Sequence, residues 1–232
     1  MFSWDASFFE PLSTIVDPPG TALGTFTMPR VREIGRIVRL QVQRQSLKIP
    51  APSAALHGRL YAPAPLIEVA SLRVSPSGVV GRSDYQTDLV DVHHAQHASS
   101  KNVNGANAIS IGFTAHYGLM RDRFGSHLTD GIAGENVLVD SAERVDLQML
   151  GAEPALIIET RDGQRVRLQD VIVAEPCVEF TRFALGFGPA DASGQAVTDG
   201  LRFLRFGMRG FYARPAGPEA VVRAGDRVLR PG

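Results

Sequence analysis

The second half of the chain is a series of short runs rich in Val, Ile and Leu, each bounded by residues that favour turns. The runs cover residues 136–140, 144–150, 155–160 and 165–175. Asp162-Gly163, between the last two runs, is typical of a tight β-hairpin turn. Many short strands with few helices indicate a mainly β structure, closed or nearly closed into a barrel with a few peripheral helices.

The first half adds further strand patterns. Residues 37–42 alternate apolar and polar side chains, as a half-buried strand does, and residues 66–74 are also typical of a strand. Residues 1–34 contain Pro18-Pro19-Gly20 and show no clear period. We therefore expect an N-terminal extension over residues 1–34 and a single barrel domain over residues 35–232. The tail, residues 220–229, reads as strand, Gly-Asp turn, strand.

Helices are expected at few places. Tyr117, Met120 and Phe124 share one helical face, which ends at Gly125, so a helix is expected near residues 113–124. Further helical stretches are expected within residues 177–206. Residues 82–107 are polar, and we expect a long loop there.

Composition indicates which partners and which cellular compartment the protein suits. Lys+Arg and Asp+Glu both number 24, so the chain lacks the general basic surface that nucleic acid requires. Cys177 is the one cysteine, which excludes an intramolecular disulfide and suits a reducing compartment. Neither a basic, apolar leader nor an apolar run of about 18 residues is found. We expect a cytoplasmic protein that does not bind membranes.

Several motifs follow one another in an order that resembles the MOSC family, the C-terminal domains of molybdenum cofactor sulfurases. They are Gly78-Val-Val-Gly81, the GIAGENVLV of residues 131–139, Glu175-Pro176-Cys177, the GMRGFYAR of residues 207–214, and the GDRV of residues 225–228. The resemblance covers roughly residues 35–230. It implies a MOSC-type β-barrel that binds the pyranopterin molybdenum cofactor at the barrel mouth.

The resemblance also implies roles for individual residues. Cys177 would carry the chemistry, as a thiolate ligand of molybdenum or as an acceptor of sulfur. Arg209 and Arg214 would bind the terminal phosphate of the cofactor. Glu135 and Asn136 would line the mouth of the pocket.

Two further residues are candidates for cofactor contact. Arg182 follows Cys177 by five residues and would stabilise the thiolate if the fold brings the two side chains together. MOSC relatives place a histidine near the pocket in the region of His93, His94 and His97; we take His94 as the candidate.

These three histidines could instead bind zinc. On a helix, His93 and His97 would share a face, but no Glu stands within the motif and the flanking residues read as loop. We therefore expect no stoichiometric zinc there.

Four functions remain open from the sequence. The leading one is the two-electron reduction of a small N-hydroxylated substrate by the molybdenum cofactor, fed by an external electron donor. The second is a non-redox carrier that takes sulfur from a cysteine desulfurase at Cys177 or delivers the cofactor. The third is a zinc hydrolase, and the fourth a catalytically silent barrel that binds a partner protein.

Overall fold

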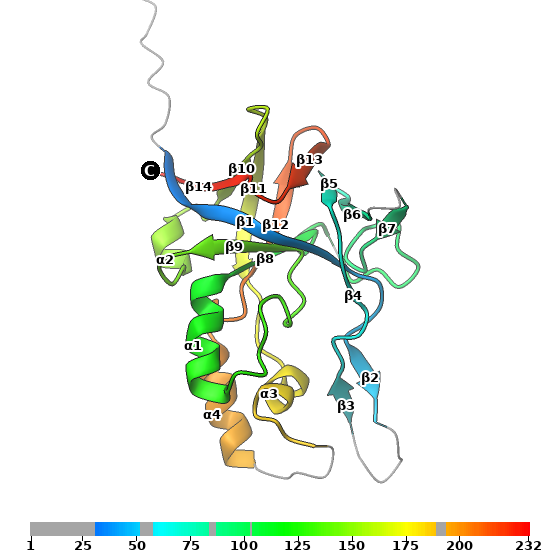
Figure 1. Ribbon diagram of the computed structural model, residues 1–232, viewed down its shortest axis with the longest axis vertical. Helices are drawn as coiled ribbons and strands as arrows, with labels where there is room; N and C mark the ends of the chain where they lie inside the picture. Colours follow the sequence, from blue (N-terminus) through cyan, green and yellow to red (C-terminus); the bar gives the residue numbers. More distant parts are fainter. Residues whose placement is uncertain (1–30, 52–57, 84–86, 103, 189–193) are drawn as a thin grey trace, which may run out of the picture.

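Seven strands close into a β-barrel in the computed structural model, which describes residues 31–51, 58–83, 87–102, 104–188 and 194–232 (Figure 1). Their order around the barrel is β14 (Arg227–Pro231), β10 (Leu156–Glu159), β11 (Arg165–Val173), β12 (Phe211–Ala216), β8 (Ile109–Phe113), β9 (Val137–Ser141) and β1 (Val31–Gln43), which pairs again with β14. Neighbouring strands are antiparallel except β8 and β9, which are parallel. The predicted mainly β barrel is confirmed.

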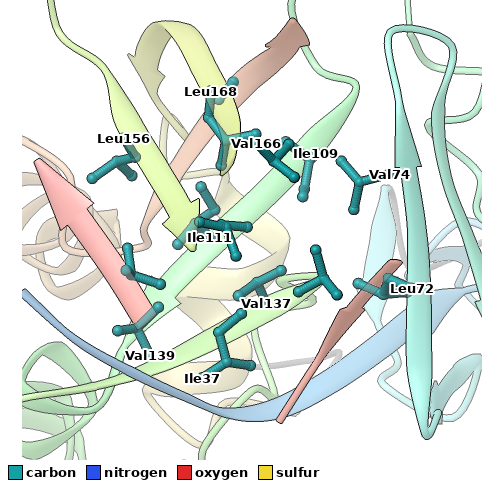
Figure 2. Close-up of a cluster of buried hydrophobic side chains, with 14 of the residues drawn as sticks. Ile37, Leu72, Val74, Ile109, Ile111, Val137, Val139, Leu156, Val166 and Leu168 are labelled. Atoms are coloured by element: carbon teal, nitrogen blue, oxygen red, sulfur yellow. The ribbon is translucent and has the colours of Figure 1, made fainter. Parts of the chain in front are cut away.

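Alternation along the strands fills the barrel. In β12, Phe211 and Ala213 are buried in the barrel core, while Tyr212 and Arg214 stand on the outer face. Side chains from strands far apart in sequence meet in the same core, as Figure 2 shows for Ile37, Leu72, Val74, Ile109, Ile111, Val137, Val139, Leu156, Val166 and Leu168. The outer face of β12 is therefore free to contribute polar side chains to a site outside the core.

A second sheet packs on the barrel and shares its core. Its strands, in order, are β13 (Ala220–Arg223), β5 (Ser71–Ser75), β6 (Gly78–Arg82) and β7 (Asp88–Val90). The run 66–74, expected as one strand, is divided between β5 and β4 (Leu66–Glu68), which pairs with β1 instead. The tail has the expected strand, turn and strand, but β13 and β14 belong to different sheets.

Asp226 explains the division of the tail. It is buried, and its carboxylate accepts hydrogen bonds from the backbone N–H groups of Arg223 and Arg161, at 2.7 and 3.2 Å. Its own backbone carbonyl bonds the N–H of Ile37 in β1. Asp226 therefore joins the two sheets, whereas the sequence indicated a simple hairpin residue.

Four short helices complete the described fold: α1 (Thr114–Phe124), α2 (Leu147–Leu150), α3 (Val178–Ala184) and α4 (Gly194–Leu204). α1, α3 and α4 bury their apolar faces in a second core below the barrel. The helices near 113–124 and within 177–206 are confirmed. The strand expected over 144–150 is wrong, because the Asp146 carboxylate accepts the Met149 N–H at 2.9 Å and caps a helical turn.

Two boundaries complete the description. β1 begins at Val31, four residues before the expected start of the domain, and residues 1–30 lie outside the described part of the chain. Among the described helices, none is both long and apolar enough to cross a membrane.

Candidate functional site

A pocket of about 290 Å³ lies at one end of the barrel, between the barrel, α3 and the hairpin of β2 (Lys48–Pro50) and β3 (Arg59–Tyr61). In Figure 1 this hairpin stands beside α3. We call it the Cys177 pocket. It is lined by Gln43, Ser46, Leu47, Lys48, Arg59, Tyr61, His93, Lys101, Asn107, Ala133, Gly134, Glu175, Cys177, Arg209 and Tyr212.

Cys177 and Arg209 meet in this pocket. Cys177 is the residue that precedes α3, and Arg209 lies in the turn that precedes β12. The Nη1 of Arg209 lies 3.9 Å from the Sγ of Cys177, and Nη2 donates to the carbonyl of Ala133 at 2.9 Å. The guanidinium also stacks over the ring of Phe180, with its carbon 4.5 Å from the ring centroid. Positive charge is thereby held beside the thiol.

A glycine makes this approach possible. Gly210, with φ of +89°, passes so close to β8 that an added Cβ would lie 2.3 Å from the carbonyl oxygen of Ile111. Any side chain at this position would push the turn away from β8, and Arg209 with it. In the Arg-Gly pair of the sequence, the glycine is therefore needed to keep Arg209 in its place beside the pocket.

The pocket concentrates positive charge in a chain with no net charge. Four cationic side chains line it, those of Lys48, Arg59, Lys101 and Arg209, against the carboxylate of Glu175. Lys48 and Lys101 are the only two lysines of the chain. The arrangement favours an anionic ligand.

Glu179 of α3 forms ion pairs with two of the four cationic side chains. Its carboxylate pairs with Arg59 at 2.9 Å and with Lys48 at 3.4 Å. Lys101 has a different partner, since its Nζ donates to the hydroxyl of Ser46 at 3.1 Å. Burial lowers the pKa of Lys101, and the positive charge of Lys48 lowers it further. Lys101 is thus the pocket lysine whose charge would gain most from an anion.

Two tyrosines flank Arg209. The hydroxyl of Tyr61 donates to the carbonyl of Ile132 at 2.7 Å, and the ring packs edge-on against Phe180. Burial raises the pKa of both Tyr61 and Tyr212, so both remain protonated. They supply neutral hydroxyl groups to a wall that otherwise carries charge.

His93, and not His94, is the histidine of the pocket. The Nδ1 of His93 lies 3.0 Å from the Oδ1 of the buried Asp91, and its ring contacts that of Tyr212. His94 is buried outside the pocket lining, where its Nδ1 accepts the N–H of Gln96. Consecutive residues in a turn point in different directions, so a step of one residue changes which ring reaches the site.

Glu135 lies behind the pocket wall. It is 3% exposed, and both of its carboxylate oxygens accept the hydroxyl of Tyr117, at 3.0 and 2.8 Å. Burial raises the pKa of this carboxyl group. We expected Glu135 at the mouth of the pocket, but its side chain points into the helical core, where it bonds to Tyr117.

Asn136 is also buried inside the protein, where its side chain bonds to neighbouring strands. It is 1% exposed; its Oδ1 accepts the N–H and the hydroxyl of Ser110, and its Nδ2 donates to Asp91 at 2.8 Å and to the carbonyl of Gln41 at 3.3 Å. All hydrogen-bonding atoms of the amide are therefore used to join β1, β8 and β9. The Glu-Asn pair resembles a site motif, but Asn136 joins strands and Glu135 bonds to Tyr117 of α1.

Two predicted arginines do not line the pocket. Arg182 lies in the last turn of α3, outside the pocket lining, and donates to the carbonyl of Gly188 at 2.9 Å. Arg214 follows Tyr212 by two residues on the outer face of β12, about 7 Å further along the strand. There it pairs with Asp170. Of the predicted site residues, Cys177 and Arg209 alone are brought together in the pocket.

The segment that holds the three histidines is a series of turns and not a helix. The Nε2 of His97 faces the carbonyl of Arg44, and its Nδ1 accepts the N–H of Ser99. Across the described ranges, no group of three His, Cys, Asp or Glu side chains is placed to hold a metal ion. The helical spacing on which a zinc site would depend is absent from this segment.

The fold has counterparts among solved structures. The YUAD protein from Bacillus subtilis matches 87% of this chain and 97% of its own, with a TM-score of 0.51 and 13% identity. This chain shares its fold. YiiM from Geobacillus stearothermophilus matches 88% of this chain and 76% of its own, with a TM-score of 0.45 and 14% identity. No protein-family model and no curated protein matches the sequence.

Proposed function

We propose that this chain is a MOSC-type protein that binds the pyranopterin molybdenum cofactor in the Cys177 pocket and reduces N-hydroxylated substrates. The observation that carries the proposal is that the one cysteine faces a pocket lined by four cationic side chains. The fold shared with the YUAD protein and the order of the MOSC-like motifs support it.

The residues of the pocket suit the two ends of such a ligand. A cysteine thiolate is a soft ligand for molybdenum, and Cys177 is partly exposed in the pocket. Arg209 lines the pocket with its Nη1 3.9 Å from the Sγ of Cys177, so the guanidinium places positive charge where an anion near the sulfur would bind. Lys48, Arg59 and Lys101 line the pocket and would bind the cofactor phosphate.

The cofactor would supply the two-electron redox chemistry, and the protein would bind and orient the reactants. A pocket of about 290 Å³ with a polar wall suits a small polar substrate in addition to part of a larger ligand. Electrons would come from an external donor, because the single cysteine of the chain cannot hold an iron–sulfur cluster.

The first test measures molybdenum in protein made by a host that synthesises the cofactor. We expect about one molybdenum per chain in the wild type and almost none in Cys177→Ser, because a hydroxyl oxygen is a poor substitute for the thiolate. The melting temperatures of the two proteins should agree within a few degrees. Benzamidoxime reduction with a reduced viologen dye as electron donor should be lost in the variant.

A second pair of variants tests the phosphate end. Arg59→Ala should weaken cofactor retention, whereas Arg214→Ala, the matched arginine outside the pocket, should leave it unchanged. A Cys177→Ser protein that keeps metal and turnover but melts earlier would show that the cysteine only packs.

The carrier function predicts a different result for the same proteins. It is supported by the position of Cys177, partly exposed beside the positive charge of Arg209. A wild type that binds cofactor, never turns over, and accepts persulfide sulfur from a cysteine desulfurase at Cys177 would replace the reductase with the carrier.

A further inference from the structure

Asp91 is a fully buried carboxylate that receives four hydrogen bonds. Its Oδ2 accepts the N–H of Gln43 at 2.6 Å and the Nδ2 of Asn136 at 2.8 Å. Its Oδ1 accepts the backbone N–H of His93 at 2.8 Å and lies 3.0 Å from the Nδ1 of the same residue. Three of these contacts come from groups that can only donate, which favours the ionised carboxylate.

The state of Asp91 decides the state of His93. An ionised carboxylate only accepts hydrogen bonds, so the Nδ1 of His93 must carry the hydrogen that lies between them. The second ring nitrogen, Nε2, then remains available, and no described residue hydrogen bonds it. Because Nδ1 is directed at Asp91 and the ring lines the Cys177 pocket, Nε2 is the ring nitrogen left to meet a ligand in that pocket.

The geometry points to His93 as a catalytic residue of the proposed reductase: we propose that it delivers a proton to the hydroxyl oxygen of an N-hydroxylated substrate, while Asp91 positions it. The inference rests on the proposed function. The reaction balances when His93 starts as the imidazolium, with its Nδ1–H held by Asp91 and a second proton on Nε2. The N–O bond breaks, two electrons arrive from a reduced electron-donor protein, and the hydroxyl takes the Nε2 proton and leaves as water, which returns the ring to the neutral form with its hydrogen on Nδ1. The nitrogen takes a second proton from solvent, and solvent reprotonates His93.

Other groups of the pocket are poorer donors for this step. The ring of Tyr212 lies 5.6 Å from that of His93, but burial raises the pKa of its phenol, so it releases its proton less readily. The hydroxyl of Tyr61 already donates to the carbonyl of Ile132, and burial raises the pKa of its phenol. The remaining titratable groups of the lining are four cations suited to binding anions, the thiol that would bind the metal and one carboxylate: Lys48, Arg59, Lys101, Arg209, Cys177 and Glu175. Only His93 combines a fixed tautomer, imposed by Asp91, with a nitrogen left for the substrate.

The first experiment uses the protein without cofactor. Long-range ¹⁵N–¹H correlation spectra of the histidine rings assign the tautomer of His93. We expect the neutral ring to carry its hydrogen on Nδ1. A neutral ring with the hydrogen on Nε2 would contradict the role of Asp91 and overturn the inference.

The second experiment uses molybdenum-loaded protein, benzamidoxime and a reduced viologen dye. His93→Ala should lower kcat about 100-fold or more, the range typical of a lost general acid, with KM and molybdenum content within twofold of wild type. Added imidazole should restore part of kcat. His97→Ala, from the same segment but outside the pocket lining, should change neither constant.

A second variant guards against a folding defect. His93→Gln fills a similar volume and donates a hydrogen bond but cannot transfer a proton, so it should lose kcat as His93→Ala does. Unchanged kcat in either folded variant, or no rescue by imidazole, would refute the role of His93 while leaving the proposed function intact. A wild type that holds no molybdenum and has no turnover would refute both.

Discussion

Two groups of polar side chains lie next to each other in this protein and use their hydrogen-bonding capacity differently. We call Gln41, Asp91, Ser110 and Asn136 the Asn136 cluster; all four are buried, and their side chains bond to one another or to the backbone. In the adjacent Cys177 pocket, the Nε of Arg209 and the Nε2 of His93 have no such partner among the described residues.

The difference teaches which polar residues to regard as functional. A buried polar group that satisfies its neighbours stabilises the fold, and its removal leaves them unpaired. A polar group that keeps a free atom beside a cavity is available to a ligand. Asp91 belongs to both groups, because it completes the cluster with one oxygen and orients His93 with the other.

The largest expected effect is on the cluster. Asn136→Ala would remove a buried hydrogen-bond partner from each of Ser110, Asp91 and Gln41. The free energy of unfolding should fall by about 3–5 kcal/mol. Urea denaturation followed by circular dichroism measures it. Asn107→Ala, from the pocket lining, is the control and should stay within about 0.5 kcal/mol of wild type; equal losses in both would erase the comparison.

The pH dependence of stability tests a second buried group. Burial lowers the pKa of His116 to about 4, and its Nε2 accepts the N–H of Val145 at 3.0 Å. Between pH 6.5 and about 4 the unfolded chain binds a proton at this residue and the folded chain does not. Stability should therefore fall as the pH falls through this window, by on the order of 3 kcal/mol.

His116→Gln is the matched variant for this measurement. It should lower stability at pH 7 but remove this part of the pH dependence, so the two stability curves converge toward pH 4. Denaturant midpoints at several pH values measure the curves. Parallel curves would show that His116 does not control the acid sensitivity of the fold.

The smallest expected effect is on the affinity of the pocket for anions. Glu179→Gln would release Arg59 and Lys48 from their carboxylate partner, which raises the local positive potential. The affinity of the cofactor-free protein for inorganic pyrophosphate should rise on the order of fivefold. Calorimetric titration at low salt measures it. Glu159→Gln is the control, because Glu159 pairs with Arg165 and Arg227 and does not line the pocket; weaker binding in Glu179→Gln would contradict the proposed anion site.

The sequence predicted the barrel because strand alternation and turn residues are local signals. The hairpin at Asp162-Gly163 joins β10 to β11 as expected, and the helical face of Tyr117 and Met120 is buried in α1. The strand predicted over 144–150 failed because a single cap, at Asp146, decided the local conformation. Local signals therefore predicted these elements but not how strands are shared between sheets, as the division of the run 66–74 between β4 and β5 shows.

The site was less predictable, because it is built from segments far apart in the chain. Cys177 and Arg209 were identified by motif, and the structure brings them together. Glu135 and Asn136 also belong to a motif, yet hydrogen bonds that only the folded chain reveals give them structural places. Lys48, Arg59 and Lys101 were missed, since they come from a hairpin and a loop without a local signature. Of the three histidines named from the sequence, His94 was chosen in place of His93. The scarcity of lysine was the one signal that could have indicated two of the lining residues.

Because lysine is so scarce, the pocket can be labelled selectively through its amines. Both lysine amines of the chain line one cavity, so a reagent that modifies amines can react at only one other kind of position, the amino terminus. A ligand held by Lys48 and Lys101 would shield both from acetylation. The mass of the intact labelled protein would then report how full the cavity is, even in a crude mixture and before the natural ligand has been identified.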